Sequence, residues 1–342
     1  MTPEALAQLW FVILGILLVG YAILDGFDLG VGILHPFLAR EDRERRLSLN
    51  SIGPLWDGNE VWLVTFAGGL FAAFPTAYAA VLSGFYTATV LLLCCLIFRA
   101  VSIEFRSKRP SPLWRSAWDY GFFLSSAGAT LIFGIVVGNT IRGVPLAASG
   151  RYTGRLLDQL NGYSLAVGLL SVSLLALHGS LFLRLKTSGP LAERAKRAGP
   201  WLFGLFAVLY FGVTIWTLTL LPHASATLEA HPVLWAVPIL NLLAVLNVPR
   251  ALHLGRPGYA FFSSSCVIAA LVALFGLAQF PRLLTSSPDL VQSLTIYNSA
   301  SSPGTLKLMS LIALIGMPLV LSYTGLVYWT FRGRVELDEH SY

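Results

Sequence analysis

Nine long apolar stretches run through this sequence, and their number and length restrict the chain to an all-α integral membrane fold. A membrane helix needs about 20 mostly apolar residues to cross a hydrocarbon core of about 30 Å. Soluble domains carry roughly 25% charged residues, whereas 12% of these 342 residues are charged and the mean hydropathy is +0.71. The predicted spans cover about residues 8–34, 54–73, 77–98, 118–138, 161–183, 200–221, 233–249, 258–279 and 305–331.

The break between the second and third spans is the least distinct one. Only Phe74-Pro75-Thr76 interrupts the apolar run there, so eight spans is the alternative. No linker long enough to separate soluble domains occurs, and the longest connections, at about 139–160 and 280–304, are polar and rich in Gly, Ser and Pro. We therefore expect residues 1–342 to form a single polytopic membrane domain.

The positive charges lie mainly on one side of the predicted membrane. With nine spans, 18 of the 23 Lys and Arg residues fall in or next to the loops after odd-numbered spans and in the C-terminal tail. The other side carries Arg142, Arg151, Arg155, Arg282 and Lys307. Because cytoplasmic loops are enriched in Lys and Arg, this pattern predicts an outside N-terminus and a cytoplasmic C-terminus. The net charge of +6 is thus a topology signal and does not indicate nucleic-acid binding.

Four acidic residues in the first two spans are the main candidates for function, because a charge at mid-bilayer costs about 2.5 to 3.5 kcal/mol. Asp25 and Asp28, and likewise Asp57 and Glu60, have the i, i+3 spacing that places both side chains on one helix face. Both pairs belong to the cytoplasmic third, since Asp25 precedes the basic loop by roughly 14 Å of helix. We expect the four carboxylates to converge. Carboxylates this close oppose each other's ionisation, so one can hold and exchange a proton, as a proton-uptake path requires.

Structural roles are the alternative for these residues and their neighbours. They comprise an N-cap role for Asp57, ion pairs of Asp25 or Asp28 with Arg45 or Arg46, and interfacial positions for Trp56 and Trp62. One cap or one ion pair does not require four acids, so function is the better interpretation of the set. Gly26 and Gly30 form a small-xxx-small pair, which predicts close approach of a neighbouring helix.

A second charged group lies at the cytoplasmic side and contains Arg99, Glu104, Arg106 and Asp119. A solvated ion-pair network is its simplest interpretation. The residues that we expect to support the acid cluster are Trp56, Asn59, Trp62, Arg99, Glu104 and Asp119.

Candidate heme ligands are scarce in the predicted spans. Heme iron takes His, Met, Cys or Tyr as axial ligands, and His178 is the one histidine well inside a span; such a residue is more often a hydrogen-bonded packing residue. The other histidines fall in loops or at span ends: His35, His223, His231, His253 and His340. The cysteines, Cys94, Cys95 and Cys266, lack paired spacing, which argues against a disulfide framework or a thiolate metal site. We predict no catalytic residue, bound cofactor or metal in this chain.

Several motifs together resemble those of a known family. Asp25–Gly32 (DGFDLGVG), Asn50–Pro54 (NSIGP) and Trp56–Leu63 (WDGNEVWL) are similar to segments of subunit II of cytochrome bd-type quinol oxidases. The likeness continues through Ser83–Tyr86 and Trp118-Asp119 and, more weakly, to Tyr323-Thr324, so it covers nearly the whole chain.

The resemblance implies a fold of nine transmembrane helices, arranged as two four-helix bundles plus one peripheral helix. It implies a heme-free second subunit in the bacterial cytoplasmic membrane, which stabilises a subunit I that carries two b-type hemes and heme d, or a third b-type heme. Subunit I oxidises quinol and reduces oxygen to water. Acids matching Asp25, Asp28 and Asp57 are implicated in proton delivery, whereas relatives often carry Gln at the position of Glu60. Small single-span subunits, lipid and quinone are further partners that the resemblance allows.

Two other hypotheses fit the same residues. A proton-coupled secondary transporter also uses buried carboxylates and glycine-broken helices, but its sites lie near the midplane between two similar halves. The Gly-rich acidic segment occurs here in the first span alone. A purely structural scaffold for subunit I would use the acids only as packing or ion-pair groups.

Overall fold

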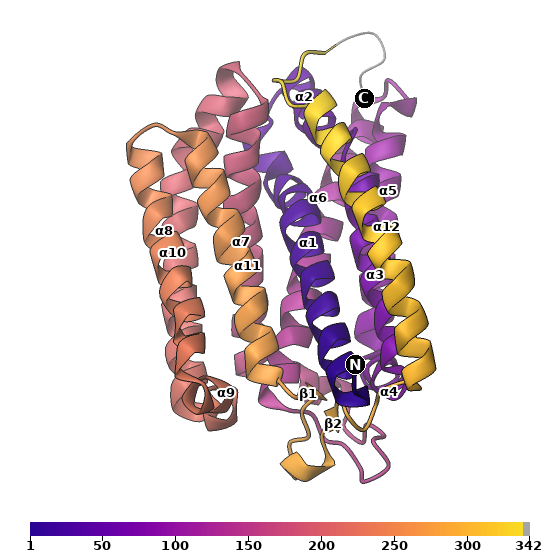
Figure 1. The fold of residues 1–342 in the computed structure, drawn as a ribbon. Helices are drawn as coiled ribbons and strands as arrows, with labels where there is room; N and C mark the ends of the chain where they lie inside the picture. The colour runs from indigo at the N-terminus through magenta and orange to yellow at the C-terminus, as the bar shows by residue number, and fades with distance from the viewer. Residues whose placement is uncertain (338–342) are drawn as a thin grey trace.

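A computed structural model describes residues 1–337 as long helices that run side by side (Figure 1). The long helices are α1 (Pro3–Leu38), α3 (Trp56–Ala73), α5 (Tyr86–Phe105), α6 (Pro112–Arg142), α7 (Gly162–Lys186), α8 (Gly189–Leu220), α10 (Ala236–His253), α11 (Pro257–Gln279) and α12 (Pro303–Thr330). The short helices are α2 (Asp42–Ile52), α4 (Pro75–Gly84) and α9 (Ala226–Ala230), and the strands are β1 (Arg282–Leu284) and β2 (Leu294–Thr295). Single 3-10 turns lie at Arg106–Lys108, Leu156–Gln159, Pro222–Ala224, Pro232–Trp235 and Leu290–Gln292.

The all-α membrane fold predicted from the apolar stretches is confirmed. Within residues 1–337, eight helices are long and apolar enough to cross a membrane. The remaining long helix, α3, has 18 residues, but its first turns carry Asp57, Asn59 and Glu60 and lower its apolar character. The long helix outside these eight, α3, therefore carries two of the four residues of the predicted acid cluster, Asp57 and Glu60.

The predicted third span, residues 77–98, is wrong in its boundaries. The helix breaks at Phe85, whose backbone leaves the helical region at φ −101° and ψ 28°, so α4 ends before it and α5 begins after it. In Figure 1, α4 lies at the end of the molecule near β1 and β2. α5 then continues seven residues past the predicted end, because Arg99, the charge that ended the prediction, is buried and ion-paired inside the protein.

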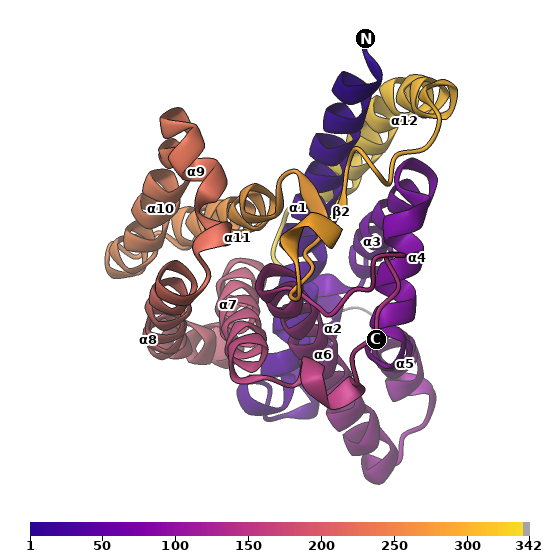
Figure 2. The ribbon, with the colours of Figure 1, turned by 90° about the horizontal axis from the view of Figure 1, so that it is seen from below.

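Two groups of helices meet along α6 and α7. Figure 2 shows α8, α9, α10 and α11 on one side and α3, α4 and α5 on the other, with α12 outside α1 and α3. α1 packs on α7 at a crossing without side-chain bulk: a Cβ added to Gly30 would lie 1.9 Å from the carbonyl oxygen of Leu175 and 2.8 Å from the amide nitrogen of Gly179. The close approach predicted for Gly30 is confirmed, and the neighbouring helix is α7.

The two ends of the molecule differ in character. The N-terminus, α4, α9 and the antiparallel β1–β2 pair lie at one end, whereas α2 and the tail after α12 lie at the other (Figure 1). The predicted polar connections fold over the first end as a hydrogen-bonded layer. For example, the amide of Val144 donates to the carbonyl of Thr285 (2.9 Å), and the Gln279 side chain donates to the carbonyl of Thr140 (3.0 Å).

Candidate functional site

A buried acid cluster lies where α1, α3 and α5 meet. Asp25 and Asp28 are fully buried, because this part of α1 is enclosed by neighbouring helices over every residue from Asp25 to His35. Arg99 of α5 is also fully buried, and its Nη2 atom donates to Asp25 Oδ1 at 2.6 Å and also to Glu60 Oε1. The Glu60 side chain is 25% exposed, so it is the acid of this cluster that reaches the protein surface.

Asp28 is held by the amide of Asn59 rather than by a cation. Asn59 Nδ2 donates to Asp28 Oδ2 at 2.7 Å and to the carbonyl of Leu24 at 3.2 Å. Tyr328 of α12 donates from its hydroxyl to Asn59 Oδ1 at 3.0 Å. The sequence analysis named Asn59 as a residue that supports the acid cluster, without a specific partner, and no signal in the sequence linked Tyr328 to it.

Acids outnumber cations in this cluster. Asp25 and Glu60 share the guanidinium of Arg99, whereas the carboxylate of Asp28 beside them is bound only by the Asn59 amide. Asp25 Oδ2 and Asp28 Oδ1 have no hydrogen-bond partner within residues 1–337. A buried charge without compensation costs several kcal/mol, so fully ionised acids are unfavourable here. The arrangement is therefore suited to holding a proton on a carboxyl group and exchanging it.

The prediction that all four carboxylates converge is wrong for Asp57. This residue is exposed on the first turn of α3, and within residues 1–337 no hydrogen bond or ion pair connects it to the buried acids. It is not the N-cap either, since Leu55 occupies that position and forms no side-chain cap bond. The two acids of α3 therefore lie in different surroundings. Glu60 pairs with the buried Arg99, whereas the side chain of Asp57 is exposed.

The tryptophans of α3 belong to the core rather than to a lipid interface. Trp56 and Trp62 are both 8% exposed. Trp62 occupies the space beside Gly20 of α1, where an added Cβ would lie 2.3 Å from its ring. Their packing fixes α3 against α1 and thereby holds Asn59 and Glu60 in register with the acids of α1.

A second buried cluster surrounds Asp119 of α6. Its carboxylate accepts hydrogen bonds from Arg45 (2.6 Å) and Arg106 (2.5 Å) and bonds to His35 Nε2 (2.8 Å). Arg106 also reaches Asp42, whose side chain is 46% exposed. The interpretation of a solvated network is wrong, because Asp119 and Arg106 are each 1% exposed. Arg99 belongs to the acid cluster instead, and Glu104 is half-buried.

His35 was placed at a span end by the sequence pattern, but the structure buries it completely. α1 extends to Leu38, and the other ring nitrogen of His35 meets the hydroxyl of Ser48 at 3.1 Å. His35 follows Asp28 by seven residues on the same face of α1, which is the signal that could have identified it. The predicted alternative of an ion pair between Arg45 and Asp25 or Asp28 is wrong, because Arg45 bonds to Asp119.

Glu44 anchors α2 to the start of α8. Burial alone would raise the pKa of its carboxyl, but hydrogen bonds from Arg194 and from the amides of Glu41 and Arg40 bring that pKa below its usual value near 4.5. The ionised form of Glu44 therefore stabilises the contact between α2 and α8, at the end of the molecule that carries most of the basic loops.

The two histidines that are buried within residues 1–337, His35 and His178, do not present a free nitrogen to a metal. His178 meets Ser264 Oγ at 2.7 Å and the carbonyl of Ile23 at 3.2 Å, and its ring stacks on Phe261 at 4.6 Å. This is the hydrogen-bonded packing role predicted for it. Residues 1–337 contain no group of three or more His, Cys, Asp or Glu side chains placed to hold a metal ion. His340 lies outside the described residues.

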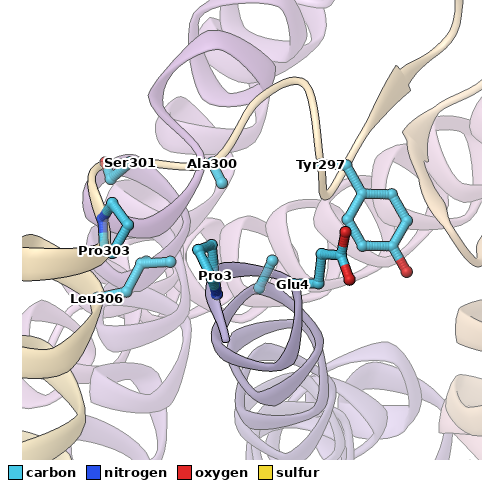
Figure 3. A pocket seen from close by; sticks show the side chains of 8 residues that line it. Pro3, Glu4, Tyr297, Ala300, Ser301, Pro303 and Leu306 are labelled. Carbon is cyan, nitrogen blue, oxygen red and sulfur yellow. The ribbon is translucent and has the colours of Figure 1, made fainter. Parts of the chain in front are cut away.

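A hollow of about 320 Å³ lies at the opposite end of the molecule from α2. Pro3 and Glu4 at the start of α1 face Tyr297, Ser301 and the start of α12 across it (Figure 3). Its lining contains one carboxylate and no cation, and it is remote in the fold from Arg99 and Asp119. It therefore adds nothing to the charged clusters.

Comparison with known proteins gives the family. Residues 6–331 match the model of the family described as cytochrome bd terminal oxidase subunit II. The chain is 35% identical to the cytochrome bd-I ubiquinol oxidase subunit 2 of Escherichia coli K12, covering 98% of this chain and 97% of that protein. It is 34% identical to the cytochrome bd ubiquinol oxidase subunit 2 of Bacillus subtilis 168, covering 98% of each chain.

The fold agrees with this match. A chain of the solved bd oxidase of Geobacillus thermodenitrificans superimposes with a TM-score of 0.77 at 20% sequence identity, over 96% of this chain and 98% of that one. Sequence and fold lead to the same result: this chain belongs to the family of cytochrome bd terminal oxidase subunit II.

Proposed function

We propose that this chain is the heme-free second subunit of a bd-type quinol oxidase, and that it stabilises a heme-bearing subunit I and carries part of a proton-uptake path. Family membership supports the oxidase assignment over the secondary transporter. The hemes, two of b type with heme d or a third b-type heme, would be bound by subunit I, where quinol is oxidised and oxygen is reduced to water. This assignment is supported by the engagement of both ring nitrogens of His35 and His178 within the protein.

The proposed topology has nine crossings in the bacterial cytoplasmic membrane, with the N-terminus outside and the C-terminus in the cytoplasm. α3 would be the ninth crossing, with its polar residues Asn59 and Glu60 in contact with α1, α5 and α12. α1, α3, α5 and α6 would form one four-helix bundle, α7, α8, α10 and α11 the other, with α12 peripheral. The positive-inside rule supports this orientation, since the end with α2 and the C-terminal tail holds most of the basic loops.

The observation that carries the proton-path proposal is the excess of buried acids over cations around Arg99. A purely structural ion pair would balance Asp25 with Arg99 and would require neither Asp28 nor Glu60 beside it. The additional carboxylates leave the cluster negative when all are ionised, which favours uptake of a proton from water. Protons would enter at Glu60, the partly exposed member, pass to Asp25 on the same guanidinium of Arg99, and exchange with Asp28 three residues further along α1.

Purification from the native membrane in mild detergent tests the oxidase assignment. The reduced-minus-oxidised visible spectrum should contain b- or d-type heme bands, and mass spectrometry should identify a second, heme-bearing polypeptide in equal amount. A chain that purifies alone and without heme would refute the assignment.

Substitution separates a proton path from a scaffold. Asp25→Asn in the purified complex should lower oxygen consumption at least tenfold while the heme spectrum stays unchanged, because a carboxamide does not exchange protons. Asp57→Asn measures whether the exposed acid on α3 also takes part. If both variants assemble and keep full turnover, the chain is a scaffold.

A further inference from the structure

α12 is the least enclosed of the long helices, and a few polar contacts attach it. Leu306 is the one residue of α12 that is buried. Near that end, Trp10 Nε1 donates to the carbonyl of Leu306 and to Ser310 Oγ, each at 3.1 Å. Past the other end, Lys186 of α7 donates to the carbonyl of Phe331. Between these contacts, Tyr328 reaches the acid cluster.

The hydrogen bond from Tyr328 holds the carbonyl end of the Asn59 amide, while the Nδ2 end binds Asp28 and the carbonyl of Leu24. With Tyr328 donating to Oδ1, the Nδ2 group faces Asp28 and the carbonyl of Leu24 and donates to both. The flipped amide would direct Oδ1 at the carboxylate of Asp28 and Nδ2 at a hydroxyl. Two acceptors, Asn59 Oδ1 and the Asp28 carboxylate, would then face each other in a buried site, where an unmade hydrogen bond costs about 1 to 3 kcal/mol.

The Tyr328 ring is itself fixed by neighbours. It packs edge-on against Phe27 of α1 at a ring-centroid distance of 6.5 Å, and Phe27 lies between Asp25 and Asp28 in the sequence. Three residues after Tyr328, the carbonyl of Phe331 accepts a hydrogen bond from Lys186 at the end of α7. The amide of Val335 in turn donates to the carbonyl of Lys186 at 2.8 Å. The hydroxyl therefore has a defined position, which a freely moving surface tyrosine would lack.

We propose that Tyr328 is a positioning residue for the acid cluster: through Asn59 it fixes the hydrogen bond that Asp28 accepts, so that the seating of α12 controls proton exchange at Asp28. This inference rests on the proposed proton path and adds its regulation by the last helix. Movement of α12 away from α1 and α3 would release Asn59, free its amide to rotate and change the environment of Asp28 without moving any carboxylate.

The test uses Tyr328→Phe in the assembled complex, which keeps the ring and its packing on Phe27 and removes one hydroxyl. The matched control is Tyr323→Phe, on the same helix but 67% exposed and without a contact to the cluster. Infrared spectra give the readout: the carbonyl stretch of the protonated Asp28 carboxyl is identified by its loss in Asp28→Asn. Tyr328→Phe should shift this band and lower oxygen consumption several-fold, whereas Tyr323→Phe should change neither.

A second variant keeps the test decisive if Tyr328→Phe assembles poorly. Asn59→Ala should shift the same band, and adding Tyr328→Phe to it should produce no further shift, because the hydroxyl acts through the amide. An unshifted Asp28 band in Tyr328→Phe, or additive shifts in the double variant, would overturn the positioning role. If the band shifts as expected but Asp28→Asn retains full turnover, positioning is correct and the proton path is the part that fails.

Discussion

Arg99→Gln tests the electrostatics of the acid cluster most directly. Asp25 and Arg99 are both fully buried, so removing the guanidinium leaves a buried carboxylate without compensation, which costs about 3 to 5 kcal/mol. The bond to Glu60 contributes less, because that side chain is 25% exposed whereas Asp25 is fully enclosed. Loss of stability should therefore come mainly from Asp25.

A double-variant comparison separates the two acids. Asp25→Asn added to Arg99→Gln should recover about 0.5 to 3 kcal/mol, the range found for directly coupled residues. Glu60→Gln added to Arg99→Gln should recover less than Asp25→Asn does, because Glu60 is the more exposed partner. Denaturation of the complex by a denaturing detergent in mixed micelles, followed by circular dichroism, gives the differences between variants. The heme spectrum verifies assembly before each titration.

Equal recovery from both second substitutions would refute this reasoning, because it would show that burial does not distinguish Asp25 from Glu60. Full stability of Arg99→Gln alone would refute it as well. The Asp25→Asn and Arg99→Gln double variant should stay inactive even where its stability returns, since the exchangeable carboxyl is gone.

Three further outcomes follow from the structure. Glu44, whose pKa is lowered by its hydrogen bonds, stabilises the fold above pH 4.5 and loses this effect as the pH falls through its folded-state pKa; the melting temperature of Glu44→Gln should therefore lie below that of the wild type at pH 7 and approach it below about pH 4.5, and a difference that grows on acidification would contradict the assignment. Gly30→Ala should destabilise the complex by at least about 1 to 3 kcal/mol, because its Cβ would meet α7, whereas Gly15→Ala has nothing within 4 Å and should be tolerated; equal melting temperatures would count against the close crossing. Asp119→Asn should cost about 3 to 5 kcal/mol and increase hydrogen exchange in α2, and unchanged exchange there would show that the Asp119 cluster does not hold α2.

The sequence was sufficient for the fold class, because long apolar runs have one solution in lipid. It was insufficient where a charge is buried inside a span. Arg99 ended a predicted helix that in fact continues to Phe105, since a pattern of residue types does not reveal that Asp25 and Glu60 compensate the charge. The same limitation placed His35 at the end of the first span, whereas α1 continues to Leu38 and buries this residue.

The candidate site was predicted in part for a similar reason. Spacing along one helix relates Asp25 to Asp28, and it brings Asn59 and Glu60 to the same part of α3. It does not fix the rotation of α3 about its own axis, and that rotation leaves Asp57 exposed. Tyr328 lies 269 residues from Asn59 in the sequence, so only the packing of α12 could bring the two together.

Proton uptake during oxygen reduction tests the central claim most directly. The complex, reconstituted in vesicles, is compared with Asp28→Asn by an indicator dye that follows proton consumption on the cytoplasmic side after an oxygen pulse. We predict that the variant keeps its heme spectrum but takes up protons at least tenfold more slowly. Uptake at the wild-type rate in a fully assembled Asp28→Asn complex would contradict the proposal that this chain carries protons through its buried acids.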